Sequence, residues 1–78
     1  MYAIVKETHA IFSGNIQTPR GNRAHKDRTI KKGQMFQVVE FKIATGLATY
    51  GSQCVVMRDE RDGYIMKDFR DRFDYTET

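Results

Sequence analysis

The hydrophobic residues of this chain recur mostly with the period of two that is typical of β-strands, and turn residues separate the apolar segments. The clearest segment is residues 34–43, where apolar side chains occupy both faces of the expected strand. One face carries Phe36 and Val38, and the other carries Met35, Val39 and Phe41. Two apolar faces indicate a strand that the fold encloses or bends sharply. Gly33, just before it, predicts a turn with positive φ.

Further apolar segments predict strands at residues 2–8, 53–58 and 64–66, with a short last strand or frayed tail at 74–78. The side chains expected in the core are Ile4, Phe36, Val38, Val56 and Ile65. After residue 66 the period changes, because Phe69 and Phe73 are four positions apart. Residues 67–73 are therefore expected to form a short helical turn that presses both rings on the core.

Three segments have no strand or helix period, and they are predicted to be connections. Residues 9–29 are rich in Gly, Asn and Pro, which predicts one long loop after a possible extension of the first strand. Residues 44–52 form a second loop. Residues 59–63 end in Asp-Gly and predict a tight hairpin with positive φ at Gly63. Its three acidic side chains are expected to be solvated.

Short strands, one long early loop and one late helical turn predict an all-β fold, a small five-stranded barrel. At 78 residues the chain has the length of a single domain spanning residues 1–78. Its lone cysteine, Cys54, excludes an intramolecular disulfide and a cysteine-based zinc site. A buried thiol and a reducing, cytoplasmic setting are expected. The N-terminus is too short and too charged for a signal peptide.

Two motifs are similar to those of SH3 domains. The segment from Ile30 to Glu40 resembles the diverging turn and the strand that follows it. The segment Gly63-Tyr64-Ile65-Met66-Lys67-Asp68-Phe69 is similar to the segment that enters the single helical turn of that family. The resemblance implies an SH3-like barrel, of the type that small bacterial and phage accessory proteins use to hold nucleic acid or another protein.

The resemblance implies the scaffold rather than the proline-rich ligand of SH3 domains. The chain has no Trp, Met66 stands where the family has a groove proline, and the long loop is basic rather than acidic. The aromatic pair that opens the long loop in that family is also absent. The peptide-groove residues are therefore not retained.

The positive charge of the chain is concentrated in one stretch. Between residues 20 and 32 there are six basic side chains and one acidic one, although the net charge of the whole chain is only +3. The stretch is either a solvated loop or a binding surface for an acidic partner, and both interpretations stay open. The residues expected to contact a partner are Arg20, Arg23, Lys26, Arg28, Lys31 and Lys32, with Tyr64 and Phe69 as desolvated anchors.

No catalytic motif is present, and His9 and His25 lack the neighbouring ligands of a metal site. We therefore expect no enzyme activity, no cofactor and no metal. The function expected is that of a non-enzymatic binding module: a small effector, an adaptor or an inhibitor, that docks on an acidic surface of a larger protein or nucleoprotein complex. Direct binding of nucleic acid by the same basic loop is the alternative. No membrane partner is expected, and the sequence leaves the oligomeric state open.

Overall fold

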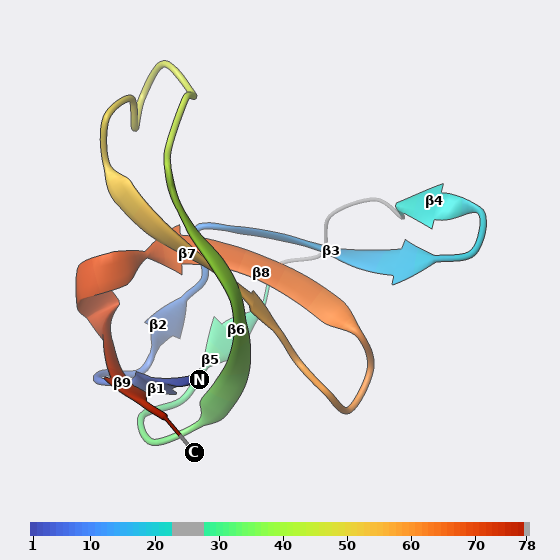
Figure 1. The fold of residues 1–78 in the computed structure, drawn as a ribbon, viewed down its shortest axis with the longest axis horizontal. Coiled ribbons are helices and arrows are strands. Elements are labelled where there is room, and N and C mark those ends of the chain that lie inside the picture. The colour runs from blue at the N-terminus through green and yellow to red at the C-terminus, as the bar shows by residue number, and fades with distance from the viewer. Residues whose placement is uncertain (23–27, 78) are drawn as a thin grey trace.

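The computed structural model describes residues 1–22 and 28–77, and its architecture is antiparallel β-sheet (Figure 1). This confirms the all-β prediction. The strands are β1 (Tyr2–Val5), β2 (His9–Ala10), β3 (Ser13–Thr18), β4 (Gly21–Asn22), β5 (Thr29–Ile30), β6 (Met35–Ile43), β7 (Gln53–Arg58), β8 (Tyr64–Phe69) and β9 (Phe73–Thr76), and a 3-10 turn, η1, spans Arg70–Arg72. One sheet has the strand order β4-β3-β8-β7-β6-β1-β9, and β2 pairs with β5 separately.

Strand β6 is the longest strand described, and it bends at a β-bulge between Val38 and Glu40. The first part of β6 pairs with β1, whereas the part after the bulge pairs with β7 alone. The β6–β7 hairpin therefore extends beyond the rest of the sheet, at the top of Figure 1. A bulge adds one residue and reverses which side chains face the core, so Phe41 comes to lie opposite the buried Val55. The prediction of a bent strand is correct, but β6 is not enclosed.

The core is a cluster of buried side chains from β1, β5, β6, β7, β8 and β9, with one from the connection between β2 and β3. Its members are Ala3, Val5, Ile11, Ile30, Phe36, Val55, Met57, Tyr64, Met66 and Phe73. Phe36 confirms its prediction, and Val38 is half-buried and packs against the cluster. The predicted core positions Ile4, Val56 and Ile65 are wrong, because these side chains are only partly buried. Each has an apolar neighbour at the adjacent position, so the alternation alone could not decide which one faces inward.

The prediction of one long loop over residues 9–29 is also wrong, because β2, β3, β4 and the start of β5 lie within it. Strand β3 has the sequence Ser-Gly-Asn-Ile-Gln-Thr, which carries no strand period. It is extended because its backbone pairs with β8, from Ser13 opposite Lys67 to Ile16 opposite Tyr64. Tertiary pairing thus overrides the local preference of these residues.

The helical turn near the C-terminus is shorter than predicted. Residues 67–69 belong to β8, only Arg70–Arg72 form the 3-10 turn, and β9 begins at Phe73. The ring of Phe73 is in the core as expected. The ring of Phe69 is half-buried and instead packs beside Phe12, with 5.0 Å between the ring centroids.

Both glycines that were expected to support turns have positive φ, 88° at Gly33 and 73° at Gly63. Cys54 is fully buried, as its apolar strand predicted. In the part of the chain that the structure describes, there is no helix of the length and hydrophobicity that crossing a membrane requires.

Candidate binding surface

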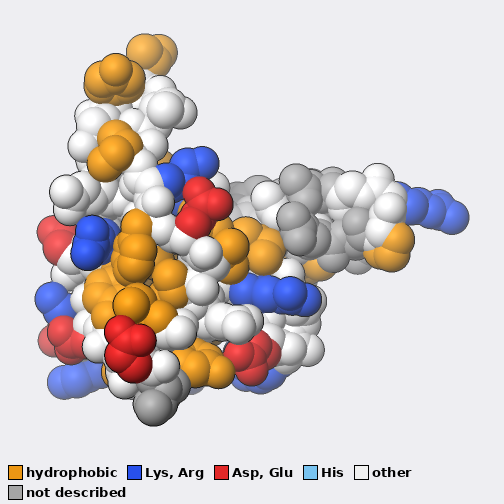
Figure 2. Space-filling view, in the orientation of Figure 1, with side chains coloured by type: hydrophobic (Ala, Val, Ile, Leu, Met, Phe, Trp, Pro, Cys, Tyr) orange, Lys and Arg blue, Asp and Glu red, His pale blue; other side chains and the backbone are white. Residues whose placement is uncertain are grey.

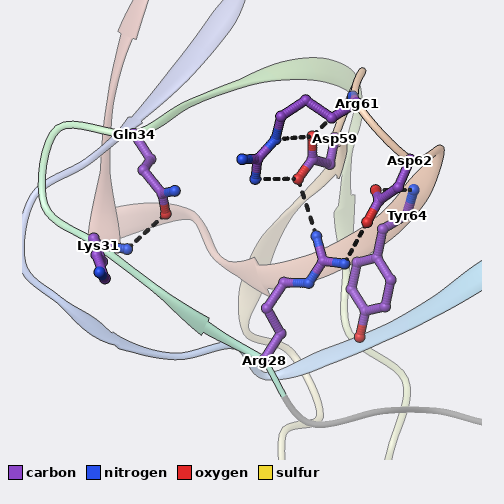
Figure 3. Close-up of polar contacts among 7 residues, drawn as sticks. All are labelled: Arg28, Lys31, Gln34, Asp59, Arg61, Asp62 and Tyr64. Atoms are coloured by element: carbon purple, nitrogen blue, oxygen red, sulfur yellow. Dashed lines mark hydrogen bonds and ion pairs between the residues drawn. The ribbon is translucent and has the colours of Figure 1, made fainter.

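Arg28 lies between Asp59 and Asp62, two of the three acidic residues of the β7–β8 hairpin, and the ring of Tyr64 (Figure 3). Its Nη1 donates to Asp59 Oδ2 at 3.0 Å, and its Nη2 donates to Asp62 Oδ2 at 2.6 Å. Its guanidinium carbon is 3.8 Å from the centroid of the Tyr64 ring. Arg28 therefore fastens the segment before β5 to the hairpin, and its charge is already paired within the protein.

Asp59 is buried, with 3% of its surface exposed, so the prediction of a fully solvated hairpin tip is wrong at this position. Its carboxylate also accepts hydrogen bonds from the backbone N–H and the side chain of Arg61, at 3.0–3.2 Å. The hydrogen bond from the Arg61 side chain holds the pKa of Asp59 below its ordinary value. Burial opposes this effect, and the charge of Arg28 lowers the pKa further. The hydrogen bond from Arg28 likewise lowers the pKa of Asp62.

Replacing Arg28 tests whether this residue is structural. We expect Arg28→Ala to lower the free energy of unfolding by about 2 kcal/mol, because it removes a charged donor from the buried carboxylate of Asp59. The exposed Lys32 is the matched control, and Lys32→Ala should change stability by less than about 0.5 kcal/mol. Denaturant unfolding of both variants gives the comparison. Equal stability of the two would mean that Arg28 is free to bind a partner.

The depressed pKa of Asp59 predicts a loss of stability in acid. The contribution of Asp59 is complete above its ordinary value of 3.8 and is lost as the pH falls through the lower value of the folded state. The free energy of unfolding should therefore decline between about pH 5 and pH 2, and Asp59→Asn should flatten that decline. Asp74→Asn, at an exposed carboxylate, controls for the general effect of removing one negative charge. A profile unchanged by Asp59→Asn would contradict the assignment.

Of the six basic residues expected to form one surface, the four that the structure describes are not gathered in one place. Arg20 is exposed in the turn between β3 and β4, a hairpin that projects to the right in Figures 1 and 2. Lys31 and Lys32 are exposed in the turn between β5 and β6, on another side of the molecule. Arg28 is paired internally, and the predictions for Arg23 and Lys26 lie outside the described residues.

Tyr64 cannot act as an exposed anchor, because only 1% of its surface is accessible. It is a core residue, and the guanidinium of Arg28 lies over its ring. Phe69 is partly accessible and belongs to a different surface, where cationic side chains lie over aromatic rings. We call this the cation–aromatic surface, and it comprises Phe12, Phe41, Lys67, Phe69, Arg70, Arg72 and Tyr75.

The cation–aromatic surface has two parts, each with its own aromatic rings. In the first, the guanidinium of Arg72 is 5.0 Å from the centroid of Phe69, and Lys67 Nζ is 5.5 Å from that of Phe12. In the second, the guanidinium of Arg70 is 4.4 Å from the centroid of Phe41. Such contacts are attractive and hold a charged head in a fixed orientation over the ring.

A cleft of about 530 Å³ is bordered by residues of both parts of this surface. It is lined by Ser52, Gln53, Phe69, Arg70, Asp71, Arg72 and Tyr75. The hydroxyl of Tyr75 donates to the backbone carbonyl of Arg70 at 2.8 Å, which fixes the 3-10 turn against β9. Burial raises the pKa of Tyr75 to about 12.

The buried Asp68 contacts the last residue of the 3-10 turn, Arg72. Its side chain is fully buried and lies 2.7 Å from Nε2 of His9 and 3.4 Å from Nη1 of Arg72. His9 also donates from Nδ1 to the carbonyl of Glu7 at 2.7 Å. His9 is thus a structural partner of a buried carboxylate. Among the described residues, no group of three or more His, Cys, Asp or Glu side chains is placed to hold a metal ion.

The projecting β6–β7 hairpin carries exposed apolar side chains. We call residues 41–53 the apolar arm, after Ile43, Leu47 and Tyr50, of which Leu47 is fully exposed and Tyr50 is 79% exposed. Figure 2 shows hydrophobic side chains at the end of this hairpin, at the top of the view. Monomeric proteins rarely leave large apolar side chains grouped in this way without a binding role.

Sequence reasoning missed the cleft residues Arg70, Arg72 and Tyr75. The available signal was the segment Phe69-Arg70-Asp71-Arg72-Phe73, in which two arginines lie between two rings. The contribution of Phe41 could not be found this way, because it depends on the bulge that turns its side chain toward η1. Comparisons of the chain with protein-family models, curated proteins and solved structures found no match.

Proposed function

We propose that this protein is a non-enzymatic binding module, an adaptor or inhibitor that docks on an acidic surface of a larger protein. We further propose that its sheet curls into an SH3-like barrel. The order of the elements supports this, since the long segment of residues 9–29 precedes the turn at Gly33 and the long strand β6. A second loop, the tight β7–β8 hairpin, the 3-10 turn and a last strand then follow in that order.

The apolar arm is the observation that carries the proposal. Leu47 and Tyr50 lie on a loop that contributes nothing to the core cluster, although Ala44 at its base is buried. Exposed aliphatic and aromatic side chains gain free energy when a protein surface covers them. A nucleic-acid backbone offers no comparable apolar surface. The arm therefore favours a protein as the direct partner.

The charges next to the arm favour an acidic partner. Lys42 is exposed on the arm, and Arg70 is exposed beside its base. Among the described residues, neither side chain has a carboxylate within ion-pair distance. Cations that are not neutralised internally attract an acidic surface and accelerate association.

Nucleic acid is the second candidate ligand, and one observation favours it. Lys67 over Phe12 and Arg72 over Phe69 place cations beside partly accessible rings, as in proteins that bind single strands by stacking. Both rings are already in contact with each other, however, at a centroid distance of 5.0 Å. Less ring surface therefore remains for a base.

Affinity capture with two variants tests the proposal. The double variant Leu47→Ser/Tyr50→Ser should lose at least about tenfold in affinity for the captured partner, since each side chain is expected to contribute about 1 kcal/mol or more on burial. Thr45→Ser, at an exposed position in the same loop, is the matched control and should bind as the wild type does. Affinity is measured by calorimetry with the purified partner at two salt concentrations.

Nuclease treatment before capture separates the two candidate ligands. A stoichiometric protein that survives the nuclease, requires the apolar arm and is released by salt supports the proposal. Loss of every partner after nuclease treatment would instead support nucleic acid. A protein partner that binds the double variant as well as the wild type would exclude the arm as its contact.

A further inference from the structure

A second, smaller pocket continues the cleft beside η1 along the base of the apolar arm. It has a volume of about 150 Å³ and is lined by Phe41, Lys42, Ile43, Gln53, Cys54 and Arg70. Gln53 and Arg70 line both cavities, so the two adjoin. We call the combined feature the trough. One end of it is polar and cationic, and the other end is bordered by the exposed side chains of Phe41 and Ile43.

The cationic end of the trough is held in place before any ligand binds. Arg70 lies over Phe41, and Phe41 in turn meets Tyr75 edge-on at a centroid distance of 5.3 Å. Arg72 lies over Phe69 and is also held by the buried Asp68. A guanidinium fixed over a ring loses little conformational entropy when it pairs with a carboxylate.

The charge of the trough suits an anionic ligand. Its lining includes three cations, Lys42, Arg70 and Arg72, and a single carboxylate, that of Asp71. Arg70 is the cation shared by both cavities, so an anionic group bound to it lies at the junction of the polar and apolar ends. A ligand that fills the trough therefore needs an acidic group and an apolar group close together.

We propose that the trough binds a short extended segment of the acidic partner, in which an acidic and a large apolar side chain are two residues apart. In an extended strand, side chains two residues apart point to the same face and are separated by about 7 Å. The carboxylate pairs with Arg70, and the apolar side chain packs against Phe41 and Ile43. This inference rests on the proposed function and specifies the segment that the module recognises.

A peptide fits the trough better than a phosphate or a nucleic acid does. An inorganic phosphate would leave the apolar end empty. A base could stack only on a free ring face, and Phe41 already has Arg70 over one face and Tyr75 at close contact. An aliphatic side chain needs no free face, because it packs against Ile43 and the remaining accessible surface of the ring.

The test is a titration of the full-length, ¹⁵N-labelled protein with acetyl-Ala-Glu-Ala-Leu-Ala-amide, followed by amide chemical shifts. The amides of Gln53, Arg70 and Arg72 should shift, with saturation in the millimolar range that is usual for weak short ligands, Kd about 1 mM. Two control peptides replace Glu by Gln or Leu by Ser, and each should bind at least fivefold more weakly. Inorganic phosphate and a short oligothymidine are titrated in parallel.

Protein variants show whether the trough is the site. Arg70→Gln should weaken the binding of the Glu-Ala-Leu peptide at least fivefold, whereas Arg58→Gln, at an exposed arginine of β7 outside the trough, should leave it unchanged. Thermal unfolding of both variants confirms that they are folded. Rescue of part of the affinity by Arg70→Lys would indicate that the charge, rather than packing on Phe41, is the main requirement.

Three results would overturn the inference. The first is the absence of any amide shift in the trough at about 10 mM peptide, far above the expected Kd of about 1 mM. The others are equal binding of the peptide with Gln in place of Glu, and tighter binding of phosphate or oligothymidine at the same residues. If the trough fails while capture of a protein partner still requires Leu47 and Tyr50, the proposed function stands and only the recognised segment is wrong. If both fail, the proposed function fails as well.

Discussion

Phe36→Ala should lower the free energy of unfolding by about 3–5 kcal/mol, the usual cost of deleting a buried aromatic ring. Phe36 is 4% exposed and belongs to the core cluster. Its strand β6 pairs with both β1 and β7, so it is an interior strand of the sheet. In a chain of 78 residues, this loss approaches the whole stability.

Denaturant unfolding monitored by circular dichroism checks this result. The neighbouring Met35 is half exposed on the opposite face of β6, so Met35→Ala should cost less than about 1 kcal/mol. A similarly small loss for Phe36→Ala would show that Phe36 does not fill the core. The register of β6 against β1 and β7 would then be incorrect.

Gly14→Ala should cost about 3 kcal/mol, at the upper end of what overpacking usually costs. A Cβ atom at Gly14 would lie 2.5 Å from Cε1 of Tyr64 and 2.6 Å from its hydroxyl oxygen. Tyr64 is buried and lies under the guanidinium of Arg28, so its ring cannot move without disturbing the pairing of Arg28 with Asp59. Glycine is required at this position by the close approach of β3 to the ring.

Gly46→Ala is the matched control, because a Cβ atom there would meet only Thr49 Oγ1, at the ordinary distance of 3.5 Å. Its stability should stay within about 1 kcal/mol of wild type, in either direction. The Tyr64→Leu background isolates the contact, since adding Gly14→Ala to it should cost much less than in the wild type. Strictly additive effects would mean that Gly14 and Tyr64 do not touch.

The sequence was most informative where turn chemistry and apolar residues agreed. Gly33 and Gly63 were correctly identified as positive-φ positions, and the strands they border were found with small errors at their ends. It was least informative about which face of a strand is buried. Consecutive apolar residues, as at Val55 and Val56, satisfy either orientation, and the choice depends on which neighbouring strand covers them.

Strand β3 and the role of Arg28 could not be predicted for a related reason. Strand β3 is ordered by pairing with β8, about 50 residues later in the chain. The residues of β3 by themselves do not indicate that pairing. Arg28 was interpreted as a free cation because it lies among other basic residues. Its partners Asp59 and Asp62 are more than 30 residues away, and only the fold brings them together.

The candidate surface was predictable only in part. Phe69 was identified in advance, and it lines the cleft. Arg70 and Arg72 follow it directly, but their importance depends on stacking over Phe41 and Phe69, which requires the bulge in β6 and the position of β9. The exposed residues Leu47 and Tyr50 were assigned to an ordinary loop, because a sequence does not show that a hairpin projects beyond its sheet.

Hydrogen exchange of the complex with the captured partner, compared with the free protein, tests the central claim most directly. We predict that protection on binding concentrates in residues 41–53 and 70–72, which form the apolar arm and the edge of the trough. The turn at Arg20 and the hairpin around Asp59 should exchange as in the free protein. Protection confined to the β3–β4 hairpin, with no change in the arm or at η1, would contradict the account.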